Sequence, residues 1–145
     1  ALFSPDTAAL MGEVVALRDT CWRTVVFAHW GEEYHSTSTV QQRAAAHAFV
    51  DAGADLVVGA HPHVVQEVET YQGKAIFYSL GNFMFDQNFS WETTHGLALV
   101  ADFTDTNTQF TLIPTTIKQQ HAALDTGADR LRTLQIATVA DFTLP

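Results

Sequence analysis

The sequence predicts an α/β fold, and three observations support this prediction. Apolar runs at 23–28 and 55–58 have the length and the β-branched content of buried strands. The segment 38–52 between them has helical spacing, so strand, helix and strand form a βαβ unit with a parallel strand pair. Four later strand-like runs are joined in pairs by short turns, a pattern typical of hairpins.

The composition is that of a folded globular chain of at most one domain. The chain has 145 residues, of which 47% are hydrophobic and 16% are charged. Sixteen acidic residues outnumber seven basic ones, and the formal net charge is −9. This balance argues against nucleic acid or an anionic membrane surface as a partner.

Two helices are expected in the first half of the chain, at 5–18 and 38–52. The first opens with a serine cap and a proline in its first turn, and its apolar residues recur at helical spacing. The second is capped by Ser38 or Thr39 and ends at Gly53, where a glycine most easily adopts the left-handed conformation.

The second half of the chain is expected to be mainly extended. Its two hairpins pair 64–71 with 74–80 and 95–103 with 109–114. Pro114 cannot donate to a ladder, which places its strand near an edge or at an end. The tail, from about 126 to 141, has a helical pattern.

Histidines follow the two predicted parallel strands. Gly59 is expected to end the second strand, and His61-Pro62-His63 comes directly after it. Proline disfavours the helical region for the residue before it, so an extended segment would point both imidazoles the same way. His29 stands in the same position after the first strand. Imidazole is a ligand for zinc, manganese and iron, whereas the simpler reading is a set of hydrogen-bonded loop histidines.

A third strand end carries Gly81 and Asn82. Asn82 either satisfies backbone groups in a turn or offers its carbonyl oxygen to a metal or its amide to a phosphate. The aromatic stretch that follows, 83–91, either covers the core or forms one wall of a substrate cleft. If the three strand ends meet at one edge of the sheet, three histidines and an asparagine surround one volume, which predicts a metal site.

Three sequence blocks resemble a known family. They are His29-Trp30-Gly31 with Glu33-Tyr34; Gly53-Ala54-Asp55 with Gly59, His61-Pro62-His63 and Gln66; and Tyr78-Ser79-Leu80-Gly81-Asn82-Phe83. These blocks are similar to the signatures of the poly-γ-glutamate capsule synthesis (CapA/PgsA-type) family, within the calcineurin-like metallophosphoesterase superfamily. The resemblance runs from about Thr24 to Asp86.

The resemblance implies the C-terminal half of a four-layer α/β/β/α metallophosphoesterase-like sandwich with a pair of divalent metals, Mn, Fe or Zn. It implies that His29, His61 and His63 are metal ligands. Four other residues become candidates for contacting the substrate or supporting the ligands: Glu33, Tyr34, Gln66 and Asn82.

The chain departs from the superfamily in one respect. The Asp-x-His block, the bridging aspartate and the Asn-His block of the superfamily are not found before His29. Carboxylates near the expected cleft are limited to Glu32, Glu33 and Asp86. Residues 1–145 are therefore expected to form a single partial domain with an incomplete metal pair, inactive in isolation. Its apolar edge would be covered by the missing N-terminal half or by another copy of the chain.

Two functions from different classes follow. In the full-length protein the site would belong to a metal-dependent hydrolase that acts on a phosphoester in capsule biosynthesis. The alternative is a non-catalytic component that binds polyglutamate during polymer assembly or export. The resemblance also implies a location on the extracellular side of the cell membrane.

Overall fold

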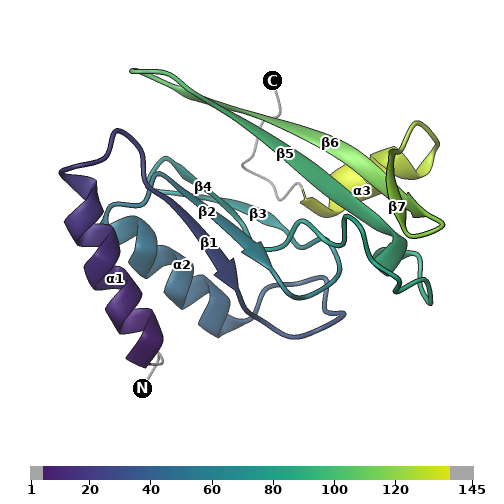
Figure 1. Ribbon diagram of the computed structural model, residues 1–145, viewed down its shortest axis with the longest axis horizontal. Coiled ribbons are helices and arrows are strands. Elements are labelled where there is room, and N and C mark those ends of the chain that lie inside the picture. Colours follow the sequence, from purple (N-terminus) through teal and green to yellow (C-terminus); the bar gives the residue numbers. More distant parts are fainter. Residues whose placement is uncertain (1–4, 138–145) are drawn as a thin grey trace.

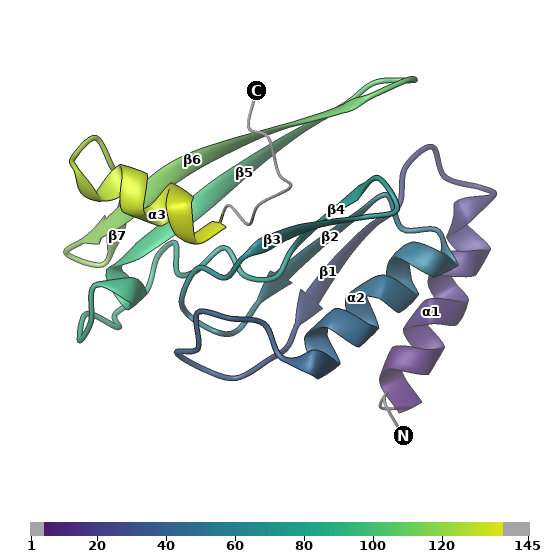
Figure 2. The same cartoon turned by 180° about the vertical axis from the view of Figure 1, so that it is seen from behind.

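The protein has a mixed α/β fold with two β-sheets, consistent with a fragment of an α/β sandwich, and the predicted fold class is confirmed. The computed structural model describes residues 5–137. In chain order the elements are α1 (Pro5–Arg18), β1 (Val25–His29), α2 (Val40–Ala52), β2 (Leu56–Ala60), β3 (Val68–Tyr71), β4 (Lys74–Phe77), the 3₁₀ turn η1 (Glu92–Thr94), β5 (His95–Phe103), β6 (Thr108–Lys118), β7 (His121–Leu124) and α3 (Asp129–Ala137). Figures 1 and 2 show α1 and α2 together on one side of β1–β4, with the long β5–β6 hairpin on the other side.

The first sheet contains the predicted βαβ unit. Its strand order is β1-β2-β4-β3, with β1, β2 and β4 parallel and β3 antiparallel to β4. The register between β1 and β2 runs from Val25 opposite Leu56 to His29 opposite Ala60. The hairpin predicted around Gln72 and Gly73 is confirmed as β3 and β4, although both strands are shorter than expected.

The two predicted helices of the first half are present. α1 has the predicted bounds, and its expected serine cap lies outside the described residues. In α2 the cap is Thr39, whose hydroxyl accepts from the Gln42 N–H while the Gln42 side chain accepts from the Thr39 N–H. Gly53 ends the helix with φ of 116°. These caps fix where the chain leaves the helix and enters β2.

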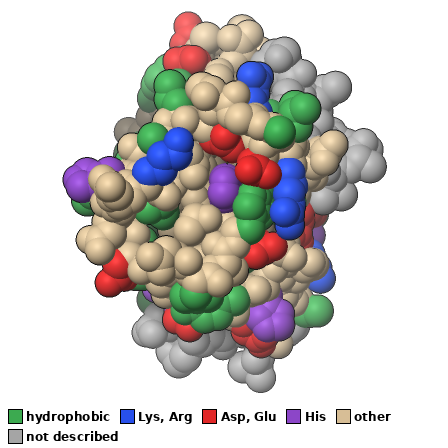
Figure 3. Space-filling view, turned by 90° about the vertical axis from the view of Figure 1, so that its right-hand side faces the viewer, with side chains coloured by type: hydrophobic (Ala, Val, Ile, Leu, Met, Phe, Trp, Pro, Cys, Tyr) green, Lys and Arg blue, Asp and Glu red, His purple; other side chains and the backbone are tan. Residues whose placement is uncertain are grey.

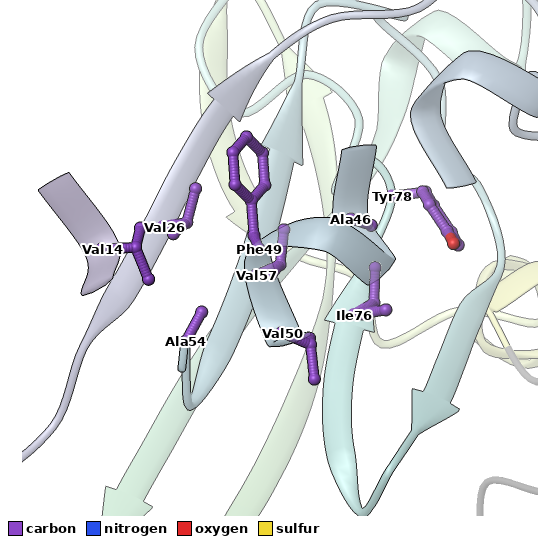
Figure 4. Packing of buried hydrophobic residues seen from close by; sticks show 9 residues of the cluster. All are labelled: Val14, Val26, Ala46, Phe49, Val50, Ala54, Val57, Ile76 and Tyr78. Atoms are coloured by element: carbon purple, nitrogen blue, oxygen red, sulfur yellow. The ribbon is translucent and has the colours of Figure 1, made fainter. Parts of the chain in front are cut away.

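One hydrophobic core lies between the helices and the first sheet. Figure 4 shows how helix residues such as Phe49 meet strand residues such as Val57 and Ile76. The buried members of this cluster are Val14, Val26, Ala46, Phe49, Val50, Ala54, Val57, Ile76 and Tyr78. A second core joins the other face of the first sheet to β5, β6 and α3, with Leu56, Val58, Phe77, Leu97, Leu112 and Ala137 among its members. The central strand β2 is thus buried on both faces, as predicted.

The prediction that the first strand is buried holds for only one of its two faces. β1 is an edge strand whose side chains alternate between exposed and buried. Val26 packs under the helices, while Val25 and Phe27 are 49% and 70% exposed on the face that belongs to the second core. The second sheet packs over β2 and β4, so one face of β1 stays open. Within residues 5–137 no helix is long and apolar enough to cross a membrane.

The position expected for Pro114 also needs correction. β6 is the central strand of the second sheet, in the order β5-β6-β7, and it continues past Pro114 to Lys118. The Pro114 carbonyl accepts from the Asp125 N–H, directly after β7 ends at Leu124. In an extended strand the nitrogen and the carbonyl of one residue point to the same side. The nitrogen of Pro114 therefore points towards β7, at the place where the β6–β7 ladder ends, so the missing N–H does not interrupt that ladder. The short strand β7 was not predicted.

Gly59 lies inside β2 and does not break it. The strand extends to Ala60, and Trp30 Nε1 donates to the Tyr78 carbonyl at 2.9 Å across the space above Gly59. A Cβ atom on Gly59 would overlap both the Tyr78 carbonyl oxygen and the Trp30 indole. The glycine is therefore required by close packing and not by chain reversal.

We expect Gly59→Ala to lower the free energy of unfolding by about 1–3 kcal/mol, because the added methyl group overpacks a rigid site. Gly12→Ala is the matched control: no atom lies within 4 Å of the added Cβ, and the site is inside α1. That variant should gain about 0.5–1 kcal/mol from helix propensity. Urea unfolding monitored by circular dichroism measures both. Equal effects of the two variants would contradict the packing argument.

Asp55, which directly precedes β2, makes the free energy of unfolding depend on pH. Burial opposes ionisation of its carboxyl, but hydrogen bonds from Lys74 Nζ at 2.7 Å and from the Thr24 N–H at 3.0 Å outweigh it. The pKa of Asp55 is therefore held below 3.8. The ionised form is favoured by folding, so the contribution is present above the unfolded pKa and is lost as pH falls through the folded pKa.

We expect Asp55→Asn to be less stable than the unchanged protein at pH 7, by up to about 1 kcal/mol because Lys74 is partly exposed. The difference should shrink as the pH is lowered below 3.8, because the unfolded chain then binds a proton that the folded carboxyl takes up only at a lower pH. Urea unfolding of both proteins at several pH values measures this. A difference that is constant from pH 7 to pH 3 would rule out the ionic contribution.

Candidate metal centre

The carboxyl ends of β1, β2 and β4 meet at one edge of the first sheet, as parallel strands must. His29 ends β1 and pairs with Ala60, so His61 follows directly beside it. The ring centroids of His29 and His61 are 4.7 Å apart, and those of His61 and His63 are 5.9 Å apart. The structure therefore brings the three predicted histidines together at one place.

Glu33 joins two of these histidines. One possible ligand atom from each of Glu33, His61 and His63 lies within 4.8 Å of the other two. Glu33 Oε1 is 3.8 Å from His63 Nε2. Within residues 5–137 this is the only group of three or more His, Cys, Asp or Glu side chains so arranged. His29 is exposed and lies next to His61, outside this group of three. We call Glu33, His29, His61 and His63 the histidine site.

The backbone at the histidine site is not extended, contrary to the prediction for His61-Pro62-His63. φ is 101° at His61 and 62° at His63, both in the region that residues other than glycine rarely adopt. Tyr34, in the facing loop, has φ of 64°. The two imidazoles converge because the chain turns sharply at each of them. Backbone strain of this kind occurs often at functional sites.

Hydrogen bonds between the two loops hold this strained backbone in place. The Trp30 N–H donates to the Ala60 carbonyl at 3.1 Å, and the Tyr34 N–H donates to the Pro62 carbonyl at 2.8 Å. The loop after β1 and the loop after β2 therefore form one unit. His29 ends β1 and Glu33 lies in the loop after it, whereas His61 and His63 lie in the loop after β2, so these bonds set the distances across the site.

Gln66 supports this pair of loops through hydrogen bonds made inside the protein. It is fully buried, and its Nε2 donates to the carbonyls of His35 and Thr37 at 2.8 and 3.2 Å. Its Oε1 accepts from Gln42 Nε2 at 2.9 Å, and Gln42 also caps α2. Both polar groups of Gln66 are thus bonded to protein. Among the four supporting candidates, it ties the loop after β1 to α2 and does not face solvent.

Aromatic side chains surround His63. The Tyr34 ring stacks on it at 5.9 Å between centroids, and Phe85 contacts it at 5.0 Å. Phe89 meets the edge of Tyr34 at 5.2 Å and is 64% exposed, while Phe83 is 57% exposed. These phenylalanines therefore do not cover the core, which was one of the two predictions for this stretch. That they form a wall for a substrate stays a prediction.

Asn82 and Gln87 are hydrogen-bonded to His63 and to Tyr34. Asn82 is 6% exposed, and its Oδ1 lies 2.8 Å from His63 Nδ1. Gln87 Nε2 donates to the Tyr34 hydroxyl at 2.9 Å. The sequence analysis did not identify Gln87, and it named Glu33 as a supporting residue and as one of three carboxylates near the cleft. The histidines were predicted from their position directly after strands. Glu33 and Gln87 lie within loops, so that pattern does not identify them.

Charges of both signs are interspersed over the surface near one end of the molecule. On the face drawn in Figure 3, basic side chains are scattered among acidic ones, and histidines reach the surface at separate places. This face therefore does not present the continuous basic patch that is typical of a nucleic-acid-binding surface.

Residues 4–87 match the protein family described as "Bacterial capsule synthesis protein PGA_cap". The chain is 54% identical over 76 residues to the PGA biosynthesis protein CapA of Bacillus subtilis (strain 168), covering 52% of this chain and 20% of that protein. It is 55% identical over 76 residues to the capsule biosynthesis protein CapA of Bacillus anthracis, covering 52% of this chain and 18% of the relative.

A more distant relative is a probable polyglutamine synthesis accessory protein of Mycobacterium tuberculosis (strain ATCC 25618 / H37Rv). The identity is 36% over 62 residues, covering 43% of this chain and 16% of the relative. The matched part of the chain thus spans a fifth or less of these relatives' lengths. The range that matches the family includes every residue of the histidine site, together with Asn82 and Gln87.

We expect Gln66→Leu to lower the free energy of unfolding by about 1–3 kcal/mol, because it leaves the buried Gln42 amide and two part-buried loop carbonyls without this partner. Hydrogen exchange of the amides at 30–38 should also become faster. Gln41→Leu, on the exposed face of α2, is the control and should change stability by less than about 0.5 kcal/mol. Unchanged exchange in the loop would show that Gln66 does not support it.

Proposed function

This chain belongs to the bacterial capsule synthesis protein family PGA_cap, and we propose that its histidine site is part of a metal-dependent phosphoesterase-like centre in a longer capsule biosynthesis protein. The observation that carries the proposal is the convergence of Glu33, His61 and His63, with possible ligand atoms within 4.8 Å of one another. His29, beside His61, is a candidate ligand for a second ion.

The donor set fits a divalent transition metal. Two imidazoles and one carboxylate suit Zn, Mn or Fe, and the carboxylate offsets part of the ion's charge. Bound divalent ions would activate water and neutralise the oxygens of a phosphoester. The chain's own contribution is to hold His61 and His63 at a fixed separation, and the strained backbone and the bonds between the two loops support that role.

The rest of the proposed centre lies outside this chain. A two-metal site needs more carboxylates than Glu33 alone, and within the described part of the chain no other carboxylate joins the cluster. The matched relatives are several times longer than the matched segment. The open face of β1, with Val25 and Phe27 exposed, is a place where another segment of a longer protein, or a second copy, would pack.

The alternative is a non-catalytic component that binds polyglutamate. A polyanion would be repelled by a chain with a formal net charge of −9, so we favour a site that binds cations. In either role the proposed location is the extracellular side of the cell membrane, and the proposed substrate of the hydrolase is a phosphoester.

We expect the intact protein to bind Mn, Fe or Zn, and the double variant His61→Ala/His63→Ala to lose the metal. Elemental analysis of purified proteins measures the content. Glu33→Gln should weaken binding without abolishing it, because it removes one charged ligand of the proposed set. His121→Ala, at an exposed histidine in β7, is the control and should retain full metal content.

Hydrolysis of a phosphodiester such as bis-p-nitrophenyl phosphate by the same proteins separates the two functions. Metal-dependent hydrolysis that is lost with His61 and His63 supports the enzyme. Metal content without hydrolysis supports a binding component instead. An intact protein that remains metal-free after incubation with each of the three metals would exclude the proposed site.

A further inference from the structure

The Asn82 side chain makes three hydrogen bonds inside the protein, and one of them is to a histidine of the site. Its Nδ2 donates to the Thr93 carbonyl at 3.1 Å and to Gln87 Oε1 at 3.3 Å, and its Oδ1 lies 2.8 Å from His63 Nδ1. We propose that Asn82 is a positioning residue that holds His63 in the tautomer protonated at Nδ1, which leaves Nε2 as the nitrogen able to bind a metal.

The Thr93 carbonyl decides which way the Asn82 amide points. A carbonyl oxygen can only accept a hydrogen bond, so the amide atom facing it must be the nitrogen. The reversed amide would place two oxygens against each other and leave buried groups without partners. The Asn82 oxygen therefore faces His63. This conclusion depends on the chemistry of the neighbours and not on how the two similar amide atoms were assigned.

The tautomer of His63 follows from the position of that oxygen. An amide oxygen accepts, so His63 Nδ1 must carry the hydrogen that fills the 2.8 Å contact. A neutral imidazole has one N–H, and its other nitrogen then carries the lone pair. That nitrogen, Nε2, is 3.8 Å from Glu33 Oε1, inside the cluster of possible ligands. The bond thus fixes both the ring orientation and the nitrogen that a metal would use.

Asn82 is itself held rigidly. Thr93 is fully buried, its N–H donates to Ser90 Oγ, and its Oγ1 accepts from the Ser90 N–H. Gln87 accepts from Asn82 and donates to the Tyr34 hydroxyl, and the Tyr34 ring stacks on His63. Asn82, Gln87 and Tyr34 therefore form a closed circuit with His63, and these three side chains cover one face and one edge of its ring.

The circuit decides between the roles that the sequence left open for Asn82. Both amide hydrogens are directed at protein acceptors, and the oxygen is directed at His63, so the side chain has no N–H to offer to a phosphate. At 6% exposure it is also withdrawn from solvent. The tautomer part of this inference stands on the hydrogen bonds alone, and the part that concerns metal affinity rests on the proposed function.

The test is NMR of the intact protein labelled with ¹⁵N-histidine, with metal removed, at a pH where the imidazoles are neutral. Two-bond ¹H–¹⁵N correlations distinguish the two tautomers, and His63→Asn identifies the His63 signal. We expect His63 to carry its hydrogen on Nδ1. A wild-type spectrum with the hydrogen on Nε2 overturns the inference, and this result needs no variant to fold.

Two variants separate positioning from a structural role. Asn82→Leu removes the acceptor, so the Nε2–H tautomer should appear and metal affinity should fall about 10–100-fold, the range for supporting partners of metal-ligating histidines. Asn82→Asp retains an acceptor oxygen and should retain the Nδ1–H tautomer. Asn88→Leu, at an exposed position in the same loop, is the control and should leave tautomer and affinity unchanged.

The outcomes are distinguishable from those of the proposed function. If Asn82→Leu leaves the His63 tautomer unchanged, Asn82 does not position the ring and the inference fails, whatever happens to metal affinity. If wild-type His63 carries the Nδ1 hydrogen but the intact protein binds no metal, the proposed function fails while the positioning by Asn82 stands.

Discussion

The parallel register of β1 against β2 is the constraint on which the site depends. It places His29 opposite Ala60, so the residue after β2 is a histidine adjacent to the last residue of β1. A shift of one residue along either strand would move every side chain to the other face of the sheet. The buried helix-facing core resists such a shift, because Val26 and Val57 must both point towards α1 and α2. Packing far from the site therefore sets the distance between His29 and His61.

Strain at the site is offset by buried amide hydrogen bonds. Tyr34, His61 and His63 have positive φ, which is unfavourable for residues with a side chain. The carbonyls of His35 and Thr37 are held by Gln66, and the loops on the two sides are joined by backbone bonds. This arrangement fixes the separation of the imidazoles through hydrogen bonds within the chain. Such preorganisation lowers the conformational entropy lost on binding.

Part of the histidine site is well supported, and part of it lies at an open strand edge. His61 and His63 are backed by buried polar groups, whereas Glu33 is exposed and His29 lies on the exposed edge strand. The open side of the histidine site and the open face of β1 are close in the fold, since His29 belongs to both. A segment that covered Phe27 would thus also approach His29. This geometry is consistent with a family in which the relatives are several times longer than the segment matched here.

By itself the sequence determined the βαβ unit, both hairpins and the gathering of His29, His61 and His63. These follow from strand-length apolar runs, helix caps and the rule that parallel strands end at one edge, all of which are local or topological. Only the tertiary structure decided that β1 is an edge strand, that Gly59 lies within β2, that Glu33 and not Glu32 or Asp86 joins His61 and His63, and that Gln87 bonds to Asn82. Each of these depends on contacts between residues far apart in the chain, such as Trp30 with Tyr78 or Asn82 with His63. A pattern of residue types carries no information about which side chain fills the space beside another.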